Sequence, residues 1–429
     1  MSAISSLTGR LIADSRPLQA GGHLLSVPGM AGRAIFHTGS SRLQFVPETG
    51  SHPPQFDAAE PLRDKADGRL HALSLAVAQQ CNLGCTYCYA QQGGFGTAAK
   101  QMKLETALKA VDALLADARE GETATLAFMG GEPLMARDII REATRYAARR
   151  ADERCVQMNF SLTTNGTLLT SDDGLFFEEH GFAVTVSIDG VGETHNALRP
   201  TKGGSGSYER ILERVQPLLS LQRRMQVSVR ATVTPLNLGL VEMLNEFVRL
   251  GFHSVGFSPM LSAPNGQHEM DGDALERMLA EMVYCGLRFE QAITSGERFP
   301  FLNMVNAMRE LHSRARRPRP CGAASGYLGM GADGTYAACH RFVGDEAHSF
   351  GSLEKGLDAA AQHAWQTARL VDTQEPCRSC WARYLCGGGC HYEVIHKGRT
   401  ACDFIRGWLH YCLQAYARLS GTTPEYFSR

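Results

Sequence analysis

Long apolar runs, a strong charge of either sign and low-complexity tracts are all missing from this sequence, and each absence excludes a class of protein. No apolar run approaches the roughly 20 residues that a membrane-spanning helix needs, and the first residues lack the charged and then apolar pattern of a secretion signal. The formal net charge is only -1 at pH 7, which argues against a nucleic acid as the main partner. The sequence therefore predicts a cytoplasmic protein that binds neither a membrane nor a nucleic acid.

Cysteine, in contrast, is abundant. The 429 residues, 44% of them hydrophobic, are enough for two or three ordinary globular domains. They include 13 cysteines, which need a reason because disulfides rarely persist in the reducing cytosol. Three lie between residues 81 and 88 and eight lie beyond residue 320, so that only Cys155 and Cys285 fall between the two groups. This distribution favours two regions that bind metals or clusters.

The central part of the chain alternates β-rich runs with amphipathic helical stretches such as residues 104–119. That alternation is typical of an α/β fold with a parallel sheet built through right-handed crossovers. Six such units predict a partial (β/α)6 TIM-like barrel. The expected strands are residues 72–78, 124–130, 157–165, 183–189, 226–234 and 254–260.

Three regions follow from this pattern. Residues 1–70, rich in Gly, Pro and Ser with two strand-like pieces, predict a small β-rich appendage. Residues 71–313 hold the barrel and a helical region after it. The basic, proline-broken run at 314–320 reads as a boundary, and residues 314–429 form the cysteine-rich region.

Cys81, Cys85 and Cys88 follow the first expected strand with the spacing CxxxCxxC. Three thiolates on a cubane 4Fe-4S cluster leave one iron free to bind a substrate, unlike the closed four-cysteine site of an electron carrier. The alternative is a structural zinc knuckle, but such sites take four protein ligands and no nearby histidine completes the set. The open cluster is the favoured interpretation.

With this motif and the aromatic Tyr87 before its last cysteine, the sequence resembles the radical S-adenosylmethionine (SAM) superfamily. The resemblance implies that the cluster on these cysteines cleaves SAM to methionine and a 5′-deoxyadenosyl radical, which removes a hydrogen atom from the substrate. It also implies that residues at the carboxyl ends of the following strands contact SAM, because barrel active sites lie at that end. These residues are Gly130, Gly131, Glu132, Asn165, Ser187, Asp189 and Arg199. Taken singly, each of them is equally consistent with a turn or a cap.

The C-terminal cysteines, with a CxxCxxxxxCxxxC core, resemble the SPASM domain, named for the peptide and sulfatase maturases that share it. That resemblance implies two auxiliary 4Fe-4S clusters and the following ligands. The nearer cluster would take Cys321, Cys339 and Cys390, and the farther one Cys377, Cys380, Cys386 and Cys402. A pair of zinc ribbons is the alternative. With three ligands, the nearer cluster is expected to offer an open iron to a substrate thiolate.

The remaining cysteines are expected in the protein interior. Cys412 falls on the buried face of a helical pattern, and Cys155 and Cys285 are likewise interpreted as buried thiols. His340, His391 and Tyr392 stand beside expected ligands, where hydrogen bonding or packing is the predicted role.

The sulfatase-maturing branch of this family carries an aspartate directly after the second SPASM cysteine, whereas this chain has His340 there. The sequence instead resembles peptide maturases that form thioethers, above all the kind that cross-links the small subunit of quinohemoprotein amine dehydrogenase. The resemblance implies a bond between a cysteine sulfur and a carbon of another residue, often Asp or Glu. It implies a peptide or small protein subunit as substrate and a reductant such as a flavodoxin or ferredoxin.

Residues 1–70 look too short and too rich in glycine for a whole leader-recognition domain, which predicts that leader binding is reduced or supplied by a separate protein. Three other functions stay open at this point. The same scaffold is compatible with C-C or C-O cross-links, with a sulfatase-maturing oxidation, or with a non-catalytic iron-sulfur electron carrier or scaffold.

Overall fold

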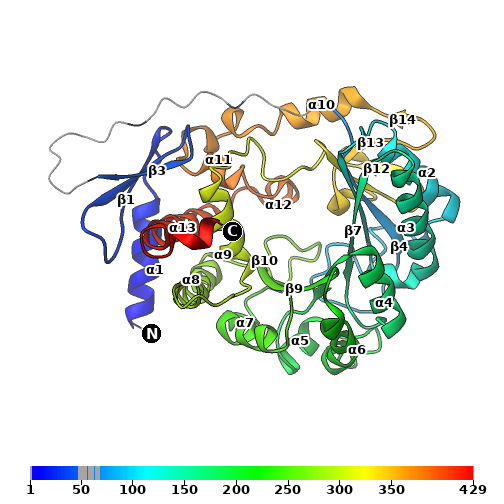
Figure 1. Cartoon of the computed structure of the whole chain (residues 1–429), viewed down its shortest axis with the longest axis horizontal. Helices are drawn as coiled ribbons and strands as arrows, with labels where there is room; N and C mark the ends of the chain where they lie inside the picture. Colours follow the sequence, from blue (N-terminus) through cyan, green and yellow to red (C-terminus); the bar gives the residue numbers. More distant parts are fainter. Residues whose placement is uncertain (1, 47–55, 57–61, 63–67, 429) are drawn as a thin grey trace.

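Six parallel strands form the part of the main sheet that carries the first cysteine motif. The computed structural model describes all residues except 1, 47–55, 57–61, 63–67 and 429. The six strands match the expected runs to within two residues at each end, and their order in the sheet is β10-β9-β8-β7-β6-β4. The predicted α/β fold with a partial barrel is confirmed (Figure 1). The strands are β4 (Ala72–Gln79), β6 (Thr123–Gly130), β7 (Gln157–Thr164), β8 (Ala183–Ser187), β9 (Gln226–Val233) and β10 (Ser254–Pro259).

The helices between these strands cover the outside of the sheet because each has one apolar face. In α7 the buried residues are Leu240, Met243, Leu244 and Phe247, which recur at the spacing of a helix face. The strands bury their outward-facing apolar side chains against these helices, leaving polar side chains for the barrel interior. The helices are α2 (Leu104–Leu115), α3 (Arg137–Asp152), α4 (Ser171–His180), α5 (Glu193–Leu198), α6 (Tyr208–Leu221) and α7 (Leu240–Arg249).

The cysteine-rich region extends the same sheet. Strand β11 (Tyr327–Met330) pairs in parallel with β4, and Tyr327 lies opposite Ala72. Three antiparallel strands continue outwards: β12 (Thr335–Ala337), β13 (Ser349–Ser352) and β14 (Gly356–Leu357). The short β5 (Lys100–Gln101) pairs with the end of β4. Hydrogen bonding in this sheet therefore runs across the boundary that the sequence suggests near residue 314.

Residues 2–46 form a helix and a small sheet. The two expected strand-like pieces are present as β1 (Gly22–Ser26) and β2 (Arg33–His37), and β3 (Arg42–Val46) completes an antiparallel sheet. Helix α1 (Ser2–Ser15) was not expected from the sequence. Of the expected appendage, residues 47–67 other than Phe56 and Leu62 lie outside the described residues.

Helix α13 (Cys402–Thr422) joins the N-terminal unit to the barrel. It packs against α1, α8 (Gly272–Thr294) and α9 (Leu302–His312), and Figure 1 shows it in red beside the blue N-terminal unit. The remaining helices are α10 (Ala359–Thr367), α11 (Arg383–Cys386) and α12 (His391–Lys397), with short 3-10 helices at 133–136, 340–342, 346–348, 371–373, 377–379 and 424–428. Within the described ranges, no helix is long and apolar enough to cross a membrane.

Two of the three cysteines expected in the interior are there. Cys285 and Cys412 are completely buried in α8 and α13. The prediction for Cys155 is wrong, because this residue is exposed. It lies in the turn between α3 and β7 with a positive φ of 54°, where the chain reverses direction at the protein surface.

Candidate functional site

The first cysteine motif forms a loop directly after β4, at the carboxyl end of the barrel. Asn165 Nδ2 donates to Cys81 Sγ at 3.7 Å, and Arg199 Nη1 donates to Cys85 Sγ at 3.9 Å. The backbone N-H of Leu83 also donates to Cys81 Sγ, at 3.5 Å. Hydrogen-bond donors directed at a sulfur atom stabilise its thiolate form. The loop is therefore suited to cysteines that bind a metal or cluster as thiolates.

The chemistry of this donor set fits an iron-sulfur cluster. Burial raises the pKa of Cys85 to about 12, with Arg199 acting in the opposite direction, so a bound metal would have to displace the proton of this thiol. In the part of the chain that the structure describes, no three His, Cys, Asp or Glu side chains converge on a single metal ion. A cubane binds each cysteine through a different iron and needs no such convergence.

Glycines let the cysteine loop lie directly on the end of β6. A Cβ atom on Gly131 would collide with the carbonyl oxygen of Gln80 and would come within 2.7 Å of Gly93 Cα. A Cβ on Gly130, which has a positive φ of 151°, would collide with the carbonyl oxygen of Ala78. The pair Gly130 and Gly131 is therefore explained by this close approach of two backbones.

Glu132 joins the ends of two strands. Its carboxylate accepts hydrogen bonds from Thr164 Oγ1 at 2.7 Å, from the backbone N-H of Asn165 at 2.8 Å and from that of Leu134 at 3.1 Å. The side chain is completely buried, and this burial raises its pKa. In the structure the carboxylate thus fixes the β7 end relative to β6, and the SAM contact expected of it stays a prediction.

Asp189 anchors Arg199 and Tyr87. Arg199 Nε donates to its carboxylate at 2.6 Å, the backbone N-H of Thr232 does so at 2.8 Å, and the Tyr87 hydroxyl donates to it as well. Asp189 has no exposed surface, so its charge depends on these donors. The arginine that the resemblance assigns to SAM is thereby held beside Cys85.

A cavity of about 590 Å³ opens at this end of the barrel. It brings together nine of the predicted site residues: Cys81, Cys85, Cys88, Gly130, Gly131, Asn165, Ser187, Arg199 and Cys390. Glu132 and Asp189 lie behind its wall, where protein groups bind their carboxylates. The cavity thus has the first cysteine motif on one side and a cysteine of the C-terminal region on the other.

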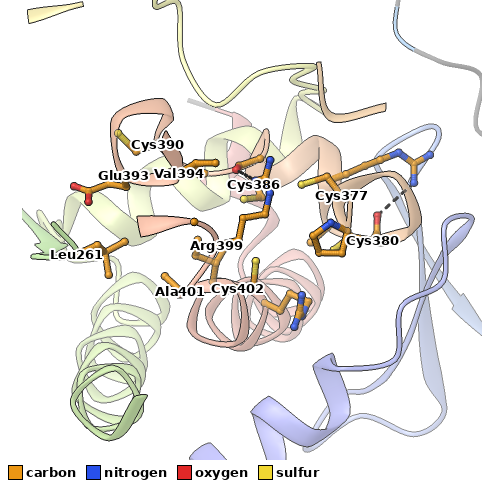
Figure 2. Close-up of a pocket in the computed structure, with 18 residues that line it drawn as sticks. Leu261, Cys377, Cys380, Cys386, Cys390, Glu393, Val394, Arg399, Ala401 and Cys402 are labelled. Atoms are coloured by element: carbon orange, nitrogen blue, oxygen red, sulfur yellow. Dashed lines mark hydrogen bonds between the residues drawn. The ribbon is translucent and has the colours of Figure 1, made fainter. Parts of the chain in front are cut away.

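The seven C-terminal cysteines predicted as ligands fall into two groups. The farther set of four lines a second pocket, and Figure 2 shows the sulfur atoms of Cys377, Cys386 and Cys402 turned towards it. Burial, followed by the electrostatic effect of the other three thiols of this set, raises the pKa of Cys377 to about 11. The pKa of Cys339 is raised to about 12, by burial and then by Cys390 and Cys321. Cys390 lines both the second pocket and the cavity at the barrel mouth, and the division of the seven cysteines between two clusters stays a prediction.

Arg341 and Glu393, which sequence reasoning did not identify, line the cavity, and Glu393 also lines the second pocket. Arg341 donates to the Glu393 carboxylate and, at 3.8 Å, to Cys390 Sγ, and its guanidinium lies 4.1 Å from the centre of the Tyr392 ring. His340 lines the same cavity, and its Nδ1 lies 2.8 Å from the Tyr327 hydroxyl. In the sequence, the only signal for Arg341 was its position two residues after an expected ligand.

Comparison with known proteins agrees with this geometry. Residues 75–248, from β4 to α7, match the model of the radical SAM superfamily. The chain is 27% identical over 366 residues to the serine-type anaerobic sulfatase-maturating enzyme of Klebsiella aerogenes, covering 81% of this chain and 86% of that protein. It is 25% identical over 342 residues to the cysteine-type anaerobic sulfatase-maturating enzyme of Clostridium novyi, with coverages of 75% and 87%.

Solved structures share the fold over most of the chain. The structure described as "Native anSMEcpe with bound AdoMet and Cp18Cys peptide" superposes with a TM-score of 0.67 at 18% identity and covers 83% of this chain and 99% of that chain. Because the identity is low, this similarity concerns the arrangement of helices and strands. It includes the cysteine-rich region as well as the barrel.

Proposed function

Since this protein is a radical SAM enzyme, we propose that it is a peptide maturase that joins a cysteine sulfur to a carbon of an Asp or Glu residue in a peptide or small protein subunit. When bound, SAM and the iron-sulfur clusters supply a 5′-deoxyadenosyl radical, which takes one hydrogen atom from that carbon, and an acceptor for the electron released as the C-S bond forms. The thiol proton leaves to solvent. The substrate thus loses two hydrogen atoms in total.

The observation that carries the proposal is the cavity shared by the two cysteine regions. The loop with Cys88 and the C-terminal Cys390 line the same space of about 590 Å³. A substrate carbon facing the first cysteine motif and a substrate thiolate held near Cys390 would therefore occupy one cavity. An enzyme that only transferred electrons would have no need for a cavity between its ligands.

The residues of the chain would divide the work as follows. Cys81, Cys85 and Cys88 would hold the SAM-binding cluster, with Arg199 and Ser187 nearest to SAM. The near and far sets of C-terminal cysteines would hold the auxiliary clusters. Arg341, held between Glu393 and the Tyr392 ring, would keep Cys390 oriented through its hydrogen bond to Sγ.

A second candidate function is oxidation of a serine or cysteine, as the names of the sulfatase-maturating relatives describe. The overall similarity to those enzymes favours it. The imidazole of His340, which is bound to the Tyr327 hydroxyl, is the main argument against it, because the resemblance places an aspartate at this position in that branch. A reductant of the flavodoxin or ferredoxin type and a cytoplasmic location are part of either proposal.

The test uses anaerobically purified enzyme, SAM, dithionite and, as candidate substrates, any small peptides that contain cysteine and are encoded near the gene for this protein. A thioether is expected as a product that has lost two hydrogen atoms and no longer reacts with iodoacetamide. Loss of two hydrogens with the thiol intact would indicate a C-C or C-O link, and an aldehyde would indicate the sulfatase type of oxidation. If no 5′-deoxyadenosine forms, or if it still forms after Cys81, Cys85 and Cys88 are changed to Ala, the assignment is wrong.

A further inference from the structure

Three arginines line the cavity, and one of them has no anion beside it. Arg199 is paired with Asp189, and Arg341 is paired with Glu393. Among the residues that the structure describes, no carboxylate, carbonyl or hydroxyl group accepts a hydrogen bond from the Arg230 guanidinium. The cavity wall therefore carries one positive charge that none of the described residues neutralises.

The position of Arg230 is built into the barrel. Its neighbours on β9, Val229 and Ala231, are buried in the hydrophobic core, so alternation along the strand turns Arg230 towards the barrel interior. It pairs in register with Ser187 on β8 and with Gly256 on β10. A Cβ on Gly256 would lie 3.0 Å from Arg230 Nη1, so this glycine leaves the space across which the arginine extends.

The Arg230 side chain is exposed and lines the cavity, so a ligand that enters the cavity can reach its guanidinium. The surrounding protein removes part of its hydration, and this lowers its pKa. A planar guanidinium with five donors is suited to bind a carboxylate through two parallel hydrogen bonds.

We propose that Arg230 binds the side-chain carboxylate of the substrate Asp or Glu whose carbon is joined to sulfur. This inference rests on the proposed function. It names Arg230 as the group that selects which Asp or Glu of the substrate is joined to the cysteine sulfur. A carboxylate held at Arg230 would lie in the same cavity as Cys81, Cys85 and Cys88. Two parallel hydrogen bonds fix the carboxylate plane, and with it which C-H bond is presented.

The carboxylate of SAM is the competing anion. Arg199 donates to Cys85 Sγ at 3.9 Å, next to the expected SAM cluster. Arg230 lies on β9, the neighbour of the edge strand β10, and among the described residues it makes no hydrogen bond to a cysteine of the first cysteine motif. This placement favours the peptide as the ligand of Arg230. The two assignments predict different behaviour of SAM cleavage in the absence of peptide.

The experiment compares wild type, Arg230→Gln, Arg230→Lys and the control Arg223→Gln, which removes an exposed arginine in the connection before β9. The probe is the peptide that the wild-type enzyme is found to cross-link, together with its analogue in which the acceptor Glu or Asp is changed to Gln or Asn. Peptide binding to each SAM-loaded holoenzyme is measured by fluorescence anisotropy. Uncoupled 5′-deoxyadenosine formation is measured with dithionite alone.

Wild type and Arg223→Gln are expected to bind the acidic peptide about tenfold or more tightly than its amide analogue. Arg230→Gln should lose this preference, Arg230→Lys should recover part of it, and uncoupled SAM cleavage should stay at the wild-type rate in all four proteins. Equal binding of both peptides by wild type would overturn the proposal, as would an uncoupled cleavage rate that falls with Arg230→Gln. Because binding is read without turnover, a failure of cross-linking in wild type would count against the proposed function separately.

Discussion

The imidazole of His23 stacks on the indole of Trp381, with ring centroids 4.1 Å apart and an angle of 9° between the ring planes. His23 belongs to β1 of the N-terminal sheet, and Trp381 directly follows the predicted ligand Cys380. Trp381 Nε1 also donates to the carbonyl oxygen of Ser15 at 2.9 Å, and Thr38 Oγ1 donates to the carbonyl oxygen of Trp381 at 2.8 Å. The N-terminal unit thus packs directly against the segment of the cysteine-rich region that carries the predicted ligand Cys380.

This contact predicts a loss of stability in mild acid. Burial, and then His410 at 2.8 Å, lowers the pKa of His23 to about 3. Because the folded-state pKa lies below the unfolded value near 6.5, the unfolded chain binds more protons between these values. The stabilisation is complete above pH 6.5 and is lost as pH falls, by about 2 kcal/mol at pH 5 for one such histidine. Anaerobic urea titrations from pH 7.5 to pH 5 measure it. His23→Gln should show a flatter slope, and an unchanged slope would contradict the assignment.

Replacing Gly131 by Ala should release the cysteine loop from β6. The new methyl group collides with the carbonyl oxygen of Gln80 and crowds Gly93, so the loop with Cys81 must move. We expect about four fewer irons per chain after anaerobic reconstitution and no SAM cleavage. Gly272→Ala is the matched control, since nothing lies within 4 Å of a Cβ there and the position begins α8. Normal iron content in Gly131→Ala would show that the close approach does not matter.

Neutralising Asp189 should destabilise the barrel mouth. Asp189→Asn leaves the Arg199 guanidinium, only 12% exposed, without its carboxylate. Breaking a buried pair in this way typically costs about 3 kcal/mol. The surface pair of Arg150 and Asp112, whose side chains are 38% and 47% exposed, supplies the control Asp112→Asn, with an expected cost below about 1 kcal/mol. Similar unfolding free energies for the two variants would argue against a structural role of Asp189.

Two cysteines of helix α13 should behave differently. Cys402 begins the helix and lines the second pocket, whereas Cys412 is completely buried among core residues. Cys402→Ala should lower the iron content by about four per chain and remove the signal of one auxiliary cluster. Cys412→Ala should keep all the iron and lower the unfolding free energy by about 1 kcal/mol. An equal loss of iron in both variants would show that the assignment of Cys402 as a cluster ligand and of Cys412 as a core residue is wrong.

The barrel strands were predictable because each is a short β-rich run that alternates with helical stretches along the chain. Arg230 was within reach of the same reasoning. In QVSVRATVT (226–234) the valines alternate with Ser228, Arg230 and Thr232, so a charge on the inner face of a central strand was visible in the pattern but was not used. Helix α1 was also missed, although Ile4, Leu7 and Leu11 follow helical spacing.

Other features depend on contacts between distant parts of the chain. No local pattern indicates that residues 327–330 add a strand beside β4, because that pairing joins segments about 250 residues apart. The pairs of Arg341 with Glu393 and of Asp189 with Tyr87 are of the same kind. The cysteine motifs predict which thiols share a cluster, whereas the groups that orient them emerged only from the packed structure.

The parallel pairing of β11 with β4 constrains how the protein is made on the ribosome. Strand β4 leads into the first three cysteines, and the edge of β4 that faces away from β6 pairs with β11. Strand β11 leaves the exit tunnel only after the rest of the barrel has been translated. Until then the nascent chain exposes an unpaired strand edge next to the loop that carries Cys81, Cys85 and Cys88. Insertion of the first cluster is therefore expected to follow release of the complete chain, and C-terminal truncations that remove β11 should accumulate as metal-free aggregates.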